Sequence, residues 1–137
     1  PMFMSDISII VRKMRIAAER SQSTSGVGFP EQLVLMCLKA HGSSNQERIA
    51  AFLDIDKGAI AKTIAKLEKK QLVARETNPN NRRENKVVLQ PAAEDVLAEL
   101  HNSYTEFENT LFAGFSAEEI KQLEHLIALA AHNVSEI

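Results

Sequence analysis

Basic side chains gather in one part of this 137-residue sequence. Residues 57–86 hold nine lysines and arginines against three glutamates, a net charge of +6. Residues 1–56 are neutral and residues 87–137 carry −8, so the whole chain is only −2. A compact positive segment attracts a polyanion, and the acidic remainder would orient its approach. Lysine-rich helices are also common as plain solvated faces, so charge alone leaves both interpretations open.

Catalytic and cofactor chemistry finds no support in the sequence. We find no glycine-rich phosphate loop, no nucleophile motif and no HExxH pair, so we predict neither an enzyme nor a cofactor. Cys37 and His41 lie one helical turn apart, a spacing that a metal ion can use. Because Cys37 lies within an apolar run, we interpret it as a buried structural residue and predict no metal site.

Length and composition are typical of one globular domain spanning residues 1–137. A single cysteine excludes an intramolecular disulfide framework. The longest apolar runs are too short to cross a bilayer, and the first residues lack the apolar stretch of a signal peptide. These features predict a cytoplasmic protein without a membrane partner.

Helical periodicity dominates the first third of the chain. Apolar residues recur on one stripe of residues 5–20, which predicts a helix. The Ser- and Gly-rich residues 21–28 predict a loop. A second helix is expected from Phe29 to Gly42, with Pro30 in its first turn.

Two shorter helices should follow. Residues 46–53 form the first, and either Ser44, in a capping box with Glu47, or Asn45 can cap it. Asp56 should cap the second, over residues 57–70. That second helix has an apolar face of Ile60, Ile64 and Leu67. Its opposite face holds Gly58, Lys62, Ala65 and Lys69, with Lys66 on the flank.

A change of period from 3.6 to two then predicts a β-hairpin. Residues 73–77 and 86–89 alternate as strands, and residues 78–81 form a turn cluster. Arg82 and Arg83 fall near the hairpin tip. Two long helices complete the chain, over residues 91–113 and from a capping box at Ser116 and Glu119 onward.

This order of elements predicts a mainly α winged helix-turn-helix with a small β-hairpin. In such a fold the second helix of the pair enters the major groove of duplex DNA, and the hairpin reaches phosphates or the minor groove. We expect residues 30–90 to bind DNA and residues 5–20 and 91–137 to dimerise. The expected DNA contacts are Asn45, Gln46, Lys57, Gly58, Ala61, Lys62, Ala65, Lys66, Arg82 and Arg83.

The apolar stripes of the terminal helices exceed what a small winged-helix core needs. We therefore expect a homodimer that buries them. Its expected interface residues are Ile7, Ile10, Met14, Tyr104, Leu111, Ile127 and Val134.

Three segments resemble the multiple antibiotic resistance regulator (MarR) family of bacterial winged-helix transcription regulators. Residues 56–73 are similar to its recognition-helix signature, residues 80–84 to its wing tip and residues 115–120 to its last inter-helix turn. The resemblance implies a homodimeric regulator, with repression as the expected mode, that releases DNA when a small aromatic or phenolic effector binds. Met14, Met36 and Tyr104 would then line the effector pocket, although methionines at helical spacing are more often core residues.

The sequence departs from the family pattern at several positions. Gly58, Ala59 and Ala61 stand where serine and threonine are usual. Gln71 replaces a glycine, so we expect that helix end to be capped differently, and Asn81 replaces the aspartate of the wing. The missing hydroxyls support an alternative, a winged-helix protein-interaction module without DNA binding. The +6 segment and the two wing arginines argue against it.

Overall fold

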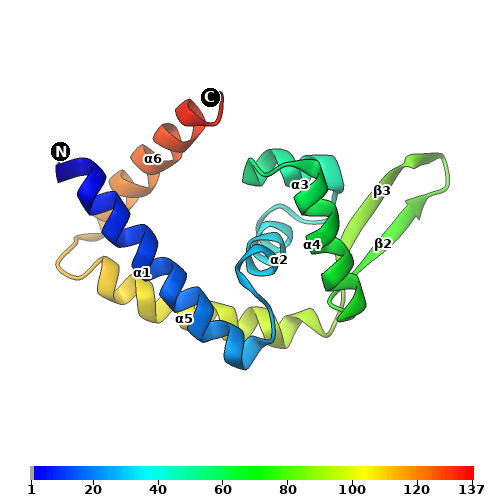
Figure 1. Ribbon diagram of the computed structural model, residues 1–137, viewed down its shortest axis with the longest axis horizontal. Helices are drawn as coiled ribbons and strands as arrows, with labels where there is room; N and C mark the ends of the chain where they lie inside the picture. Colours follow the sequence, from blue (N-terminus) through cyan, green and yellow to red (C-terminus); the bar gives the residue numbers. More distant parts are fainter. Residues whose placement is uncertain (1) are drawn as a thin grey trace.

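The computed structural model describes residues 2–137, apart from the side chains of Asn78, Arg82, Arg83 and Glu84. Its elements confirm the predicted winged helix-turn-helix between long terminal helices (Figure 1). They are α1 (Met2–Ser25), α2 (Phe29–His41), β1 (Ser44–Asn45), α3 (Gln46–Leu53), α4 (Lys57–Lys69), β2 (Val73–Asn78), β3 (Asn81–Leu89), α5 (Ala93–Leu111) and α6 (Ala117–Val134).

A small sheet of order β1-β3-β2 closes one side of the winged helix. The hairpin pairs β2 with β3 in antiparallel register, Val73 opposite Leu89, and projects away from the helices (Figure 1). Strand β3 starts at Asn81, five residues earlier than the sequence predicts, because only Pro79 and Asn80 form the turn. The short β1 was not predicted, and it pairs Ser44 with Val87.

Side-chain caps fix where the helices of the winged helix begin. The Asn45 Oδ1 accepts the amide of Arg48 at 2.8 Å, so Asn45 rather than Ser44 caps α3. Ser44 is instead held in β1, where its hydroxyl donates to the Gly42 carbonyl. The Asp56 Oδ1 accepts the amide of Ala59 at 2.9 Å, which confirms the predicted start of α4.

Helix α1 is longer than predicted. It continues through residues 21–25, which we expected to be loop, and ends at Gly26 with φ +77°. Within this stretch the hydroxyls of Ser23 and Thr24 donate to carbonyls three residues earlier in the same helix. The hydroxyls thus find acceptors inside the helix rather than in a turn, and composition alone does not distinguish the two arrangements.

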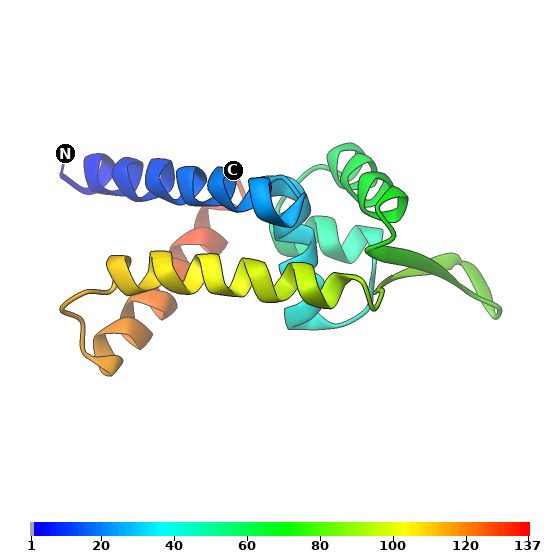
Figure 2. The same cartoon turned by 90° about the horizontal axis from the view of Figure 1, so that it is seen from below.

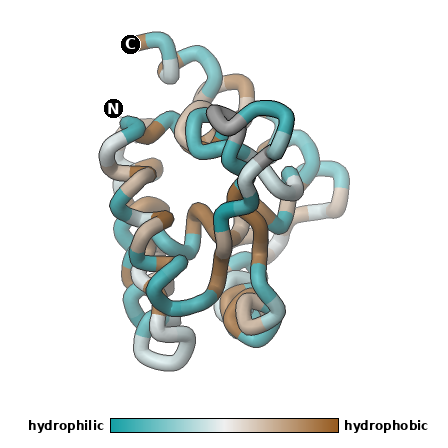
Figure 3. Tube along the Cα trace, turned by 90° about the vertical axis from the view of Figure 1, so that its right-hand side faces the viewer, coloured by the Kyte–Doolittle hydropathy of each residue, from teal (hydrophilic) through white to brown (hydrophobic). Residues whose placement is uncertain are grey.

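The core lies inside the winged helix. Its largest fully buried side chains include Leu35 of α2, Ile49 of α3, and Ile60, Ile64 and Leu67 of α4. Hydrophobic stretches accordingly gather in the middle of the trace (Figure 3). Ala93 and Leu100, in the first half of α5, belong to the same core, so this half of α5 packs against the winged helix.

The terminal helices extend beyond this core. Helices α1 and α5 run side by side along the molecule, away from the wing (Figure 2). Helix α6 has no buried residue, and Ile127 and Val134 are 47% and 60% exposed. A monomeric soluble protein rarely exposes large apolar side chains along a whole helix.

Candidate nucleic-acid interface

Helix α4 presents one face to the core and the other to solvent. Thr63 is buried with the three apolar core residues of the helix, and its hydroxyl donates to the Ala59 carbonyl. The outward face holds Gly58, Lys62, Ala65, Lys66 and Lys69, all exposed, with Ala61 half-buried beside them. This outward face therefore combines residues with little or no side chain, glycine and alanine, with long lysine side chains that carry positive charge.

The basic residues of this segment divide into two groups. Lys57, Lys70 and Arg75 each pair with a carboxylate of the protein, at 3.5, 2.7 and 2.9 Å respectively. Lys62, Lys66, Lys69 and Lys86 have no acidic partner among the described side chains. Charges without internal partners are the ones available to an external polyanion.

Asn45 and Gln46 serve the fold through their side-chain oxygens. The Asn45 oxygen caps α3, and the Gln46 Oε1 accepts a hydrogen bond from Arg75 Nη1 at 3.2 Å. Arg75 also donates to Glu68 Oε1, so this small network joins α3, α4 and β2. Both residues lie at the start of α3 and are partly exposed. Their side-chain oxygens already accept hydrogen bonds from partners within the protein.

The wing is formed by the β2–β3 hairpin. The backbone of Arg82 and Arg83 belongs to β3 next to the turn. Their side chains, which we expect to contact DNA, lie outside the described residues.

Gly58 lies in the first turn of α4, two residues after the cap. A Cβ at this position would lie 3.3 Å from Asp56 Oδ1, the atom that caps the helix. A side chain here would therefore press on the cap as well as add bulk to the outward face. Exposed Ala65, in the middle of the helix, is a cleaner position for testing that face.

The end of α4 keeps a left-handed turn without a glycine. Gln71 has φ +62°, the Leu72 amide donates to the Leu67 carbonyl, and the Gln71 amide donates to the Glu68 carbonyl. This is the Schellman arrangement, which usually places glycine at the left-handed position. Our expectation of a different cap was wrong, because the two hydrogen bonds and burial of Leu72 hold Gln71 in this conformation.

A buried glutamine joins the winged helix to the terminal helices. Gln32 is fully buried, and its Nε2 donates to the carbonyls of Ala18 in α1 and Val27 in the α1–α2 linker, at 3.1 and 2.9 Å. Its Oε1 accepts the hydroxyl of Tyr104 in α5 at 3.1 Å. Burial raises the pKa of the Tyr104 phenol, which stays protonated and able to donate.

A pocket of about 590 Å³ opens beside this tyrosine, between α2 and α5. Its lining combines apolar Met36, Leu97 and Leu100 with polar Lys39 and His101. Met36 and Tyr104, two of the three residues expected around an effector, both line it, and Met14 lies outside it. A mostly apolar hollow with a few polar groups is typical of small-molecule sites.

Cys37 and His41 do not form a joint site. Cys37 is buried in the core, whereas the His41 ring stacks on Phe52 with centroids 4.0 Å apart. Across the described residues, no group of three or more His, Cys, Asp or Glu side chains is arranged to hold a metal ion. None of the helices described is long and apolar enough to cross a membrane.

Cys37 should react slowly with thiol reagents in the folded protein. Burial both blocks access and raises the pKa of the thiol, so little thiolate is present near neutral pH. Iodoacetamide labelling followed by mass spectrometry should be slow in buffer and fast in urea. Equal rates in the two conditions would show that Cys37 is accessible and reactive.

Comparison with known proteins identifies the fold. Residues 30–85 match the model of the MarR family. A MarR transcriptional regulator from Methanosarcina mazei Go1 is 23% identical, with 99% of each chain covered and a TM-score of 0.83. A mutant MarR from E. coli complexed with operator DNA is 21% identical, covering 90% of this chain and 89% of that one, with a TM-score of 0.75. CouR from Rhodococcus jostii RHA1 bound to p-coumaroyl-CoA is 18% identical, covering 91% and 88%, with a TM-score of 0.81.

Proposed function

We propose that this chain, which belongs to the MarR family over residues 30–85, is a cytoplasmic homodimeric repressor that binds duplex DNA. Members of that family are transcription regulators rather than enzymes. We also propose that a small aromatic effector relieves this repression. In this assignment residues 30–90 bind DNA, and residues 5–20 and 91–137 dimerise.

The outward face of α4 is the observation that carries the proposal. Its small residues let the helix backbone approach the floor of the major groove, and Lys62 and Lys66 supply charge and donors without internal partners among the described side chains. Lysine donates to the O6 and N7 atoms of guanine, and alanine methyls can contact the methyl group of thymine. With few side chains able to read base edges, much of the specificity would come from DNA shape.

The uncovered terminal helices support the homodimer. The exposed apolar residues of α6 need a partner surface, and a second copy of α1, α5 and α6 offers the same kind of stripe. Interfaces of obligate dimers bury more than about 2,000 Å². A two-fold dimer would present its two α4 helices to half-sites about 34–36 Å apart on one face of the duplex.

The pocket between α2 and α5 supports the effector. Its volume falls in the range that holds small organic molecules, and an aromatic ring, Tyr104, forms part of its wall. Lys39 and His101 line the same pocket together with the carboxylates of Glu94 and Glu108, a mixed polar set that suits the hydroxyl of a phenolic effector better than a carboxylate.

DNA binding is tested by a mobility-shift series against genomic fragments. The purified protein should retain a few fragments at low nanomolar to micromolar concentration and bind random duplex more weakly. Retention of no fragment, even at low salt, would favour the alternative function, a protein-interaction module.

Replacing both wing arginines should weaken binding to selected and random DNA alike. We expect the Arg82→Ala/Arg83→Ala variant to flatten the slope of log K against log salt by about 0.9 for each phosphate that the protein no longer neutralises. Fluorescence anisotropy over a salt series measures both quantities. The Arg12→Ala/Lys13→Ala variant removes the same charge from α1 and should leave the slope unchanged. An unaltered slope in the wing variant would mean that the wing does not touch DNA.

A further inference from the structure

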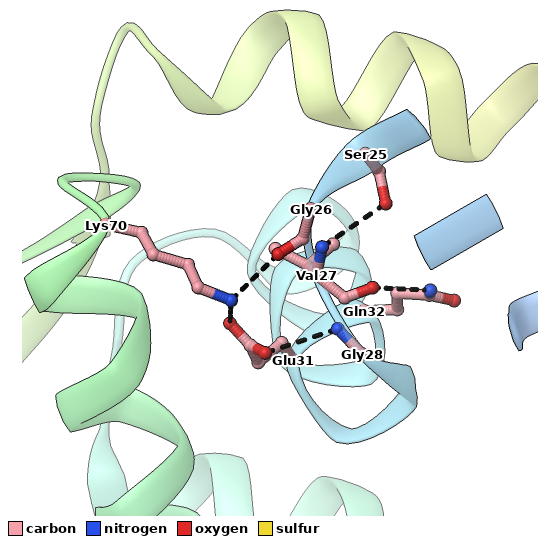
Figure 4. Close-up of polar contacts among 7 residues, drawn as sticks. All are labelled: Ser25, Gly26, Val27, Gly28, Glu31, Gln32 and Lys70. Atoms are coloured by element: carbon pink, nitrogen blue, oxygen red, sulfur yellow. Dashed lines mark hydrogen bonds and ion pairs between the residues drawn. The ribbon is translucent and has the colours of Figure 1, made fainter. Parts of the chain in front are cut away.

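Lys70 follows α4 directly, and its side chain turns back into the protein. Its Nζ donates to the Gly26 carbonyl at 2.8 Å and forms an ion pair with Glu31 Oε2 at 2.7 Å (Figure 4). The Glu31 side chain is only 9% exposed, so this contact reaches into the interior. The Lys70 side chain is itself 40% exposed. The neighbouring Lys69 is exposed as well, but it has no such partner among the described side chains.

The segment that Lys70 holds is the linker between α1 and α2, residues 26–28. Every one of its residues is held by a side chain from another element (Figure 4). The Gly28 amide donates to Glu31 Oε1 at 3.2 Å, and the Val27 carbonyl accepts from Gln32 at 2.9 Å. Val27 itself is fully buried. The linker is therefore a fixed joint rather than a free hinge.

The contact joins parts of the fold that lie far apart in the sequence. Lys70 is 44 residues from Gly26 and 39 from Glu31. On one side of the joint lies the end of α4, where the left-handed Gln71 reverses the chain; on the other lies the end of α1. A strong hydrogen bond to a charged group in a partly buried site resists displacement more than an exposed ion pair does.

We propose that Lys70 and Glu31 are positioning residues, which fix α4 to the end of the dimerisation helix and so set how the two recognition helices face one DNA duplex. The proposal rests on the DNA-binding function proposed above. In this role Lys70 does not contact a phosphate, although its charge and its place in the +6 segment favour such a contact. Positioning of this kind affects selected sites, which need both helices in register, more than random DNA, which needs only charge.

Two adjacent substitutions separate the roles of charge and position. Lys70→Met should weaken binding to a fragment retained by the wild type about tenfold, while leaving random-duplex affinity and the salt slope unchanged. Lys69→Met, which removes the same charge one residue away, should weaken both DNAs alike and flatten the slope by about 0.9 for each phosphate that Lys69 neutralises in the wild type. Lys70→Arg keeps the charge and the donors and should retain most of the selected-site affinity.

A second readout does not depend on DNA. Hydrogen exchange of the Val27 and Gly28 amides should be faster in Lys70→Met and in Glu31→Gln than in the wild type, and unchanged in Lys69→Met. Global unfolding curves of all four proteins identify any variant that has simply lost its fold. If the wild type bound no DNA, the proposed function would fail while exchange still tested the joint.

Two results would overturn the proposal. A flattened salt slope in Lys70→Met, with equal losses of affinity on both DNAs, would make Lys70 a phosphate contact. Unchanged linker exchange in the folded Lys70→Met protein would show that the ion pair does not hold the joint.

Discussion

Ile127→Lys should convert the protein from a dimer to a monomer of 15.2 kDa. Ile127 is 47% exposed in the single chain and lies on the stripe of α6 that we assign to the dimer. Two-fold symmetry places the new charge in the interface twice. Leaving a charge buried and unpaired costs about 3–5 kcal/mol, enough to raise the dimer dissociation constant by several hundredfold or more. Light scattering at micromolar concentration measures the mass directly.

The matched control is His125→Lys on the same helix. Residue 125 lies about 160° around the helix from residue 127, at about 100° per residue, beside Lys121 on the polar face. The same charge there should leave the dimer intact. A dimeric Ile127→Lys protein would place the interface elsewhere, and a monomeric wild type would remove the dimer from the proposal.

Ala65→Leu should strongly reduce binding to DNA fragments that the wild type retains. The alanine is exposed in the middle of α4, so leucine keeps helix propensity and has room in the free protein. In the complex the added atoms would enter the space that the groove floor occupies. Forcing bulk into a packed interface costs about 1–3 kcal/mol per site, and the dimer carries two sites, so we expect affinity to fall at least tenfold.

Fluorescence anisotropy with a retained fragment measures that fall in affinity. The control is Ala128→Leu, the same change at an exposed position on the polar face of α6, which should leave affinity unchanged. Native affinity in a folded, dimeric Ala65→Leu protein would mean that this face of α4 does not enter the groove.

Local sequence patterns predicted the elements that local forces decide. The apolar spacing of Ile60, Ile64 and Leu67 predicted the inward face of α4, and the cap at Asp56 predicted where the helix begins. Both features depend only on neighbours within one or two turns. The helical state of residues 21–25 was missed, since serine and threonine side chains find local hydrogen-bond partners in a loop and in a helix alike.

Long-range partnerships were beyond the sequence patterns. Nothing near Lys70 distinguishes it from Lys69, because its partners are supplied by the linker and α2 after folding. Tyr104 and Gln32 meet across 72 residues, and a glutamine within an apolar helix does not reveal where its partners lie. The left-handed Gln71 likewise depends on hydrogen bonds and burial that outweigh its local preference.

Tyr104 also makes the protein its own optical probe. It is the only tyrosine in a chain without tryptophan, so ultraviolet emission above the phenylalanine range comes from one phenol ring. That ring lies on the wall of the α2–α5 pocket, and its hydroxyl ends on the buried glutamine that is also bonded to α1 and the linker. A change in its fluorescence therefore reports on one known place in the fold. Candidate effectors that do not absorb in the same range can be titrated against the unlabelled, unmodified protein.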